Sequence, residues 1–123
     1  MTSYERAAPV PYDCPYCKAL PAGAEPVVAL PAPDPAAPGH TIVVPRRHVA
    51  NWLELGQGEK QAAWELADAV CAQLMEADVP DGFTIGIDAG IAAGQTVMHA
   101  GIQIIPRYAG DTPDPRGGVR KAL

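Results

Sequence analysis

The sequence is short of positive charge, aromatic rings and cysteine, and it has no long hydrophobic run. Nine Lys and Arg against 14 Asp and Glu give a net charge of −5 at pH 7, so the chain lacks the basic surface that sequence-independent nucleic-acid binding needs. No apolar stretch is long enough to cross a membrane, and residues 1–10 lack the pattern of a signal segment. We therefore expect a cytoplasmic protein. Three Cys in such a protein are more typical of metal ligands or buried thiols than of disulfides.

The 123 residues, 48% of them hydrophobic, are enough for one domain with a single core. We expect residues 1–13 to be an irregular lead-in and residues 14–110 to form the domain. Residues 111–123 are rich in turn residues and basic at their end, and we expect this tail to lie on a neighbouring surface. No internal repeat is visible.

An apolar stripe predicts the main helix over residues 58–78. Its members recur at spacings of three and four, as one buried face of a helix requires; they are Ala63, Leu66, Ala67, Val70, Leu74 and Ala77. Glu59 falls in the first turn, where the helix dipole favours an acid, and residues 80–82 end the helix. Cys71 lies beside the stripe and is typical of a small buried hydrophobe.

Four segments predict strands. Residues 27–30 are a short apolar run, and residues 41–44 are a continuous one that fits a buried strand. Residues 83–88 alternate between apolar and polar side chains, as do residues 95–107. The last two are joined by the short loop 89–94, so we expect them to be antiparallel neighbours. The sum is an α+β domain, an antiparallel sheet with one main helix on a face.

The strand predicted over residues 95–107 has two different faces. Apolar side chains make one of them: Met98, Ala100, Ile102 and Ile104. The other face carries Gly101 between His99 and Gln103. Glycine inside a strand costs backbone entropy and contributes no side chain, and it often marks a place of close approach. Gly101 is therefore the residue that any account of this face has to explain.

Residues 95–107, QTVMHAGIQIIPR, resemble the signature of the histidine triad (HIT) family, His-x-His-x-His followed by two apolar residues. They resemble more closely the branch that ends Gln-Thr-Val-x-His-x-His-x-Gln-x-x-Pro-Arg, and Gln in the third place is similar to the galactose-1-phosphate uridylyltransferases. The resemblance extends over residues 13–120. His99 matches the first triad position and Gln103 the third. The middle position, which in the family carries the nucleophilic imidazole, is Gly101.

The resemblance implies a homodimer and a nucleotide substrate. In the family the middle imidazole attacks the α-phosphorus of a nucleotide, while the third triad residue and its neighbours hold the phosphate oxygens. Gln95, Thr96 and Gln103 match these supporting positions, and His40 matches a family His beside the catalytic one. Gly101 cannot form the covalent intermediate, and loss of a nucleophile costs on the order of 10⁶ in rate.

Two further positions depart from the family pattern. Ala32 stands where the family has an Asp for the ribose hydroxyls, and Asp88 stands where it has an Asn directed at the phosphate. A carboxylate beside a phosphate is repelled unless it is protonated or bridged by a cation. In addition, residues 17–27 are too few for the opening strands that cover the base in the family.

These residues also have simpler interpretations. Asp88 fits a strand-end acid or a turn cap, and His40 fits a core histidine with a hydrogen-bonded ring. Gln103 fits a side chain that satisfies a buried backbone group. Arg46 and Arg107 fit surface charges better than phosphate ligands.

Cys14 and Cys17 form a Cys-x-x-Cys pair in a predicted tight loop, and this gap lets both thiolates reach one ion. The spacing does not select the other ligands. The resemblance to zinc-containing HIT proteins selects His48, which follows a Pro-basic-basic run, and His99. It implies a structural zinc closed by four protein ligands. A redox pair and simple burial of the two thiols are the alternatives.

Three functional hypotheses follow. The first is a HIT-fold nucleotide-binding protein of the nucleotidyl hydrolase or transferase type that lacks its nucleophile. The second is a remodelled enzyme of secondary metabolism that uses Asp88 and His40 as acid and base on another small molecule. The third is a non-catalytic, zinc-tied binding dimer. The otherwise intact motif over residues 95–107 favours the first.

Overall fold

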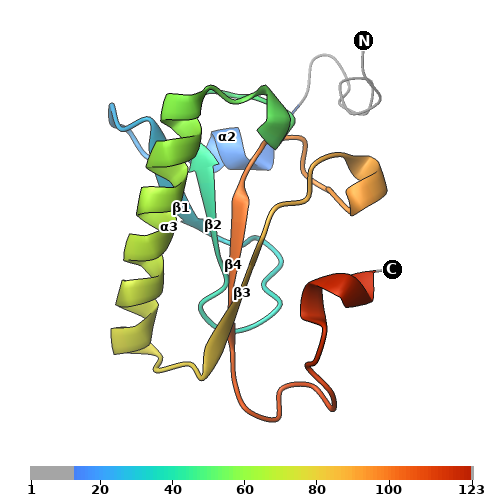
Figure 1. The fold of residues 1–123 in the computed structure, drawn as a ribbon. Helices are drawn as coiled ribbons and strands as arrows, with labels where there is room; N and C mark the ends of the chain where they lie inside the picture. The colour runs from blue at the N-terminus through green and yellow to red at the C-terminus, as the bar shows by residue number, and fades with distance from the viewer. Residues whose placement is uncertain (1–12, 123) are drawn as a thin grey trace.

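The computed structural model describes residues 13–122, so the predicted lead-in 1–13 lies, except for Asp13, outside the described residues. Within that range the chain forms an antiparallel sheet of four strands with one long helix on a face (Figure 1), which confirms the predicted α+β class. The strand order is β1-β2-β4-β3. The main elements are α2 (Pro15–Ala19), β1 (Val27–Pro31), β2 (Thr41–Pro45), α3 (Gln57–Ala77), β3 (Gly82–Gly86) and β4 (Ile102–Arg107). Among these residues, no helix is both long and apolar enough to span a bilayer.

Helix α3 lies within one residue of its prediction at each end. Its stripe packs on the sheet through three buried residues, Ala63, Ala67 and Val70, which share a core with Val43 and Ile102. Small side chains in the helix let its backbone come close to the branched residues of the central strands. Ala77, predicted in the stripe, is exposed because the helix ends there.

The first turn of α3 is fixed by its acid. The Glu59 carboxylate accepts a hydrogen bond from the Gly56 backbone N–H at 3.2 Å and pairs with Arg47 at 2.7 Å. A carboxylate in this place satisfies a free N–H group of the helix start and complements the helix dipole.

The two faces of β4 follow the predicted alternation. Ile102, Ile104 and Pro106 are buried, whereas Gln103 and Arg107 are half-buried. Cross-strand register pairs Ile102 with Val43 and Ile104 with Ile85, so these side chains lie on the side of α3. The other side of the sheet is the face that carries Gln103.

The prediction of a strand over residues 95–107 is wrong for the first half of that segment. Residues 95–101 are irregular, and a short 3-10 helix (Ile91–Ala93) precedes them. The reason lies in their hydrogen bonds: the His99 N–H donates to Val97 O within the segment at 2.8 Å, and the Ala100 N–H donates to Val49 O at 2.7 Å. These local bonds replace a strand ladder.

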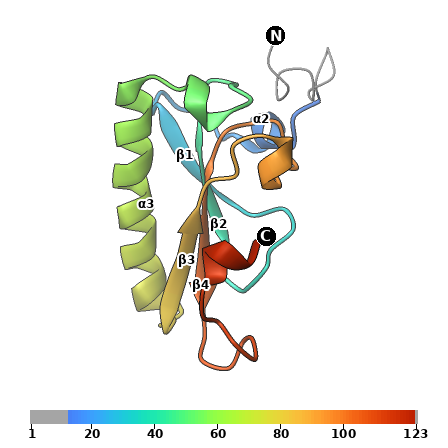
Figure 2. The same cartoon turned by 45° about the vertical axis from the view of Figure 1, so that its right-hand side comes forward.

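The sheet face opposite α3 carries the remaining elements (Figure 2): α2, the 32–40 loop and the C-terminal segment all lie on that side. A second cluster of buried residues forms there between α2, β1 and β2: Cys14, Tyr16, Leu30, Ala32, Ile42 and Val44. The predicted tight loop at Cys14 is instead a helix start, because Cys14 is the N-cap of α2. The last turn of the tail, Gly118–Ala122, contacts β3.

Candidate functional site

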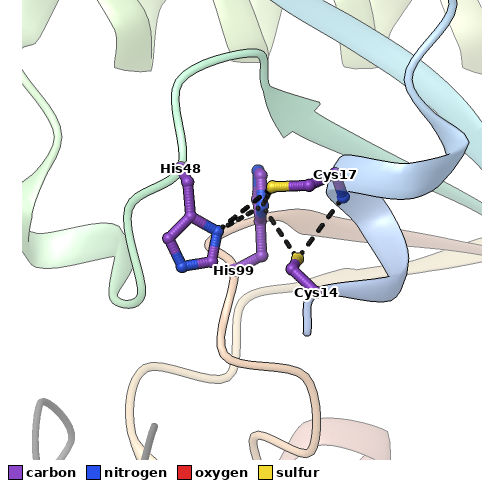
Figure 3. Close-up of side chains that lie close together, drawn as sticks. All are labelled: Cys14, Cys17, His48 and His99. Carbon is purple, nitrogen blue, oxygen red and sulfur yellow. Dashed lines mark hydrogen bonds between the residues drawn. The ribbon is translucent and has the colours of Figure 1, made fainter. Parts of the chain in front are cut away.

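Four side chains from three separate parts of the chain meet above the sheet (Figure 3): Cys14, Cys17, His48 and His99. One donor atom from each lies within 4.8 Å of the others. Cys14 Sγ is 3.4 Å from His99 Nδ1, Cys17 Sγ is 3.3 Å from His48 Nδ1, and the two Nδ1 atoms are 3.2 Å apart. Tetrahedral zinc with ordinary bond lengths separates such atoms by about 3.3–3.8 Å. The donor set therefore fits one metal ion of zinc type.

The backbone explains how these donors converge. Cys14 caps α2 and Cys17 follows one turn later, His48 lies just beyond β2, and His99 just before β4. The His99 ring donates from Nε2 to the Pro45 carbonyl at 2.8 Å. This hydrogen bond fixes the tautomer that leaves the Nδ1 lone pair facing the other donors, an arrangement that metal-binding histidines usually have.

Burial tunes two of these donors. It lowers the pKa of His99, which keeps the ring neutral and able to bind a metal. Burial, with help from the neighbouring Cys14, raises the pKa of Cys17 to about 11. A thiol of this kind becomes a thiolate ligand when a cation supplies the compensating charge, so metal binding releases protons.

Gly101 lies just before β4, close to strand β2. A Cβ atom at this position would lie 2.9 Å from Ile42 Cγ2, 3.1 Å from the Val43 carbonyl oxygen and 3.2 Å from Val44 Cγ1. Real Cβ atoms essentially never come within 3.0 Å of a heavy atom outside their own residue and its chain neighbours. A side chain at residue 101 would therefore require atoms of β2 to shift, which agrees with the predicted close approach.

A small polar cavity lies beside Gly101. It has a volume of about 30 Å³, room for very few water molecules, whereas sites for drug-sized ligands measure about 300–1,000 Å³. Its lining combines Tyr16, Val97 and the metal-ligand candidate His99 with most of the predicted catalytic and phosphate-binding residues: Asp88, Gln95, Thr96, Gly101 and Gln103.

Gln103 is oriented by His40. The His40 ring accepts the Ala36 N–H at Nδ1 (3.0 Å) and donates from Nε2 to Gln103 Oε1 at 2.6 Å. The amide oxygen of Gln103 is already bonded to His40, so the NH₂ group of Gln103 is the part that can donate to a ligand. Both ring nitrogens of His40 are occupied, so the geometry favours a positioning role for His40 over the predicted acid–base role.

The family model of the HIT domain matches residues 23–110. This chain belongs to the HIT family. Over 73 residues it is 40% identical to the bis(5'-adenosyl)-triphosphatase of Dictyostelium discoideum, and this match covers 59% of the chain and 49% of that protein. The chain spans about half the length of several of the curated relatives that it matches.

Solved structures show the same HIT fold. A Streptococcus mutans protein superposes with a TM-score of 0.74 at 34% identity, covering 85% of this chain and 71% of that one. A Zn-bound histidine triad family protein from Mycobacterium smegmatis superposes with a TM-score of 0.72 at 24% identity, covering 89% and 90%. At this identity the second likeness concerns the fold alone.

Gln95 has a different environment from the one the HIT resemblance implies. Its amide donates to Ala50 O at 2.6 Å and to Val97 O at 2.9 Å, and its Oε1 accepts the Gly90 N–H at 2.8 Å. All of these partners are backbone groups, so the side chain holds the segment before β4 in its irregular course. A phosphate-binding role for Gln95 stays a prediction, and Thr96 and Asp88 remain exposed beside the cavity.

Two features of the site carry no clear signal in the sequence. One is the place of Tyr16 in the wall of the cavity. A single aromatic residue between two Cys forms no repeating pattern, so the sequence does not predict which surface it faces. The other is a wide groove of about 740 Å³ along the outer edge of β1 and the loop 35–41, which Ala32 and His40 help to line. The groove exists because the loop folds beside an edge strand, which is a tertiary effect.

Arg46 and Arg107, the two arginines considered as phosphate ligands, each form an ion pair with an acidic side chain. Arg46 lies 3.0 Å from Glu25, and Arg107 lies 2.8 Å from Asp111. Arg107 also donates to Thr84 Oγ1 at 3.1 Å. Their charges are balanced locally, whereas Asp88 adds negative charge to the cavity. Electrostatics at this site therefore disfavour a polyanionic ligand.

Proposed function

We propose that this HIT-domain protein binds a small nucleotide-like molecule and does not turn it over by nucleotidyl transfer. The closed packing at Gly101 carries the proposal. A covalent nucleotidyl intermediate needs a nucleophile at this position; glycine supplies none, and side chains of β2 crowd the place in which a Cβ would lie.

We base the proposed ligand class on two things: the named activity of a relative and the groups that line the site in this chain. The Dictyostelium relative is by name a bis(5'-adenosyl)-triphosphatase, and the groove lined by Ala32 and His40 has the volume of a ligand site. His40 of this groove is bonded to Gln103, and the Gln103 amide and the Thr96 hydroxyl line the separate small cavity. Because Asp88 repels phosphate, we expect affinity to fall as phosphate groups are added, from nucleoside to dinucleoside polyphosphate.

We also propose that Cys14, Cys17, His48 and His99 hold one structural zinc ion. The donor distances and the His99–Pro45 hydrogen bond support this assignment. With four protein ligands the ion would have no open coordination position. It would therefore stabilise the fold by linking α2 to the segments that carry His48 and His99, and it would supply no Lewis-acid chemistry.

Metal analysis of freshly purified, untagged protein tests the zinc assignment. We expect about one zinc per chain and a lower melting temperature after chelation. Cys17→Ser should lose the metal, whereas Cys71→Ser on α3 should keep it. A wild-type protein with far less than one equivalent would contradict the assignment.

Calorimetric titration with adenosine, adenosine monophosphate and diadenosine triphosphate tests the binding function. We expect adenosine to bind at least as tightly as the monophosphate, and the triphosphate to bind least. Gln103→Leu should weaken binding by roughly tenfold, as expected for loss of one hydrogen bond, while Gln73→Leu, exposed on α3, should not. Absence of binding by all three compounds would overturn the proposal.

The second hypothesis, a remodelled enzyme, keeps one supporting observation. Asp88 is a carboxylate beside the Gln103 amide in the same cavity, and His40 is engaged on both ring nitrogens. Asp88 alone would then act as the acid or base. This candidate predicts an activity on a non-nucleotide substrate that Asp88→Asn abolishes. The third hypothesis, a zinc-tied binding dimer, would be favoured if no small molecule binds.

A further inference from the structure

Helix α2 lies on the face of the sheet opposite α3 (Figure 2). Of its five residues only Tyr16 is buried, with 6% of its surface exposed. The Tyr16 ring packs over an apolar surface formed by β1, β2 and the residue after β1; its members are Leu30, Ala32, Ile42 and Val44. Tyr16 also lines the cavity beside Gly101. Tyr16 therefore covers part of this apolar surface, together with Cys14 and Leu20, and also narrows the polar cavity.

The metal-ligand cluster provides the other anchor of α2. Cys14 and Cys17 flank Tyr16, and their sulfur atoms lie 3.4 Å and 3.3 Å from Nδ1 of His99 and His48, respectively. The Tyr16 ring meets the His99 ring edge-on, with centroids 5.8 Å apart. A helix of one turn has almost no stability of its own in water. The position of α2 therefore depends on Tyr16 and on the cluster.

The chain after α2 is fixed independently. Arg46 donates to Pro21 O at 2.6 Å and to Glu25 O at 2.9 Å, and it pairs with the Glu25 carboxylate. These bonds hold the segment 21–25 to the end of β2. Leu20 ends the helix in an extended conformation, and its side chain packs on the same apolar cluster. Movement of α2 would therefore also release Leu20, whereas the bonds of Arg46 lie beyond this residue and would stay in place.

We propose that α2 is a metal-tethered lid over a ligand site. When its link to His48 and His99 is released, Tyr16 withdraws, and the apolar surface beneath it joins the polar groups of Gln103 and Asp88. The resulting site suits a molecule with a flat apolar ring and a small polar end that carries little negative charge. The proposal rests on the proposed function for its metal and for its ligand class.

The lid makes zinc and ligand compete. Zinc holds the closed state, and the ligand binds only the open state, so each lowers the affinity of the protein for the other by the same factor. Saturating adenosine should therefore weaken zinc binding, measured by competition with a chromophoric chelator. Zinc affinity that is unchanged by saturating adenosine in a protein that binds adenosine would contradict the lid.

Tyr16→Ala tests the lid without removing the metal. In zinc-loaded protein this variant should bind adenosine at least tenfold more tightly than wild type, because the site is no longer covered. Tyr16→Phe, which keeps the ring in place, should bind as wild type does. The zinc content of both variants is measured to show that the cluster is intact. An affinity of Tyr16→Ala equal to that of wild type would overturn the proposal.

Hydrogen exchange separates failure of the lid from failure of the proposed function. On chelation, residues 13–20 should exchange faster while β2 and β4 keep their protection; unchanged exchange at residues 13–20 would contradict the lid. If the purified protein holds no zinc, the metal assignment fails, but the Tyr16→Ala comparison still decides whether α2 covers a site. If residues 13–20 open on chelation and no variant binds adenosine, the lid stands and the ligand class is wrong.

Discussion

Gly101→Ala should destabilise the fold, although replacing glycine usually has the opposite effect. Where alanine fits, the change stabilises a protein by about 0.4–1 kcal/mol because it restricts the unfolded chain. Here the new Cβ would lie 2.9 Å from Ile42 Cγ2 and 3.1 Å from the Val43 carbonyl oxygen. Ile42 is β-branched and 2% exposed, so its side chain has little freedom to move. Overpacking of this kind costs about 1–3 kcal/mol.

The net loss should be about 1–2 kcal/mol after the unfolded-state gain is subtracted, measured by urea unfolding followed by circular dichroism. In a domain of this size each kcal/mol lowers the melting temperature by roughly 3–6 °C. Gly86→Ala in β3 is the matched control, since nothing lies within 4 Å of a Cβ there, and it should leave stability unchanged or raise it. A Gly101→Ala variant as stable as wild type would refute the closed packing on which the proposed function depends.

Two further predictions concern acid stability and assembly. A hydrogen bond from Arg107 is the main cause that lowers the pKa of Asp111 from 3.8 to about 2; this ion pair therefore stabilises the fold fully above pH 4 and is lost as the pH falls toward 2. Asp111→Asn should flatten that part of an acid-unfolding curve, and an unchanged curve would contradict this role. The predicted homodimer would cover Trp64 and Ile85, which are 44% and 40% exposed on α3 and β3. Sedimentation should show a wild-type dimer that Ile85→Lys dissociates and Leu53→Lys does not; a monomeric wild type would be the contrary result.

Much of the fold could be read from the sequence because its signals are local. The stripe of Ala63, Ala67 and Val70 fixed the long helix, and the continuous apolar run at residues 41–44 matched β2. The four metal-ligand candidates come together as the resemblance implied. Those ligands are far apart in the sequence, so spacing alone would not have joined His48 to His99.

What could not be read depends on tertiary contacts. Alternation over residues 95–107 predicted one long strand, yet backbone partners of Gln95 bend its first half away from the sheet. The contact of Gly101 with Ile42 arises from the pairing of β4 with β2, which no pattern within either strand encodes. For the same reason the sequence could not show that Tyr16 covers the site.

Turnover is the most direct test of the central claim that this HIT site is closed to nucleotidyl transfer. Zinc-loaded wild type and Gly101→His would be incubated with nucleoside phosphoramidates and dinucleoside polyphosphates, beside an active HIT enzyme as positive control. We predict no turnover by either, since wild type has no nucleophile and the His variant can place its Cβ only by shifting Ile42 and Val44, which misplaces the ring. Turnover by wild type would contradict the claim outright, and turnover by Gly101→His alone would show that β2 leaves the position open.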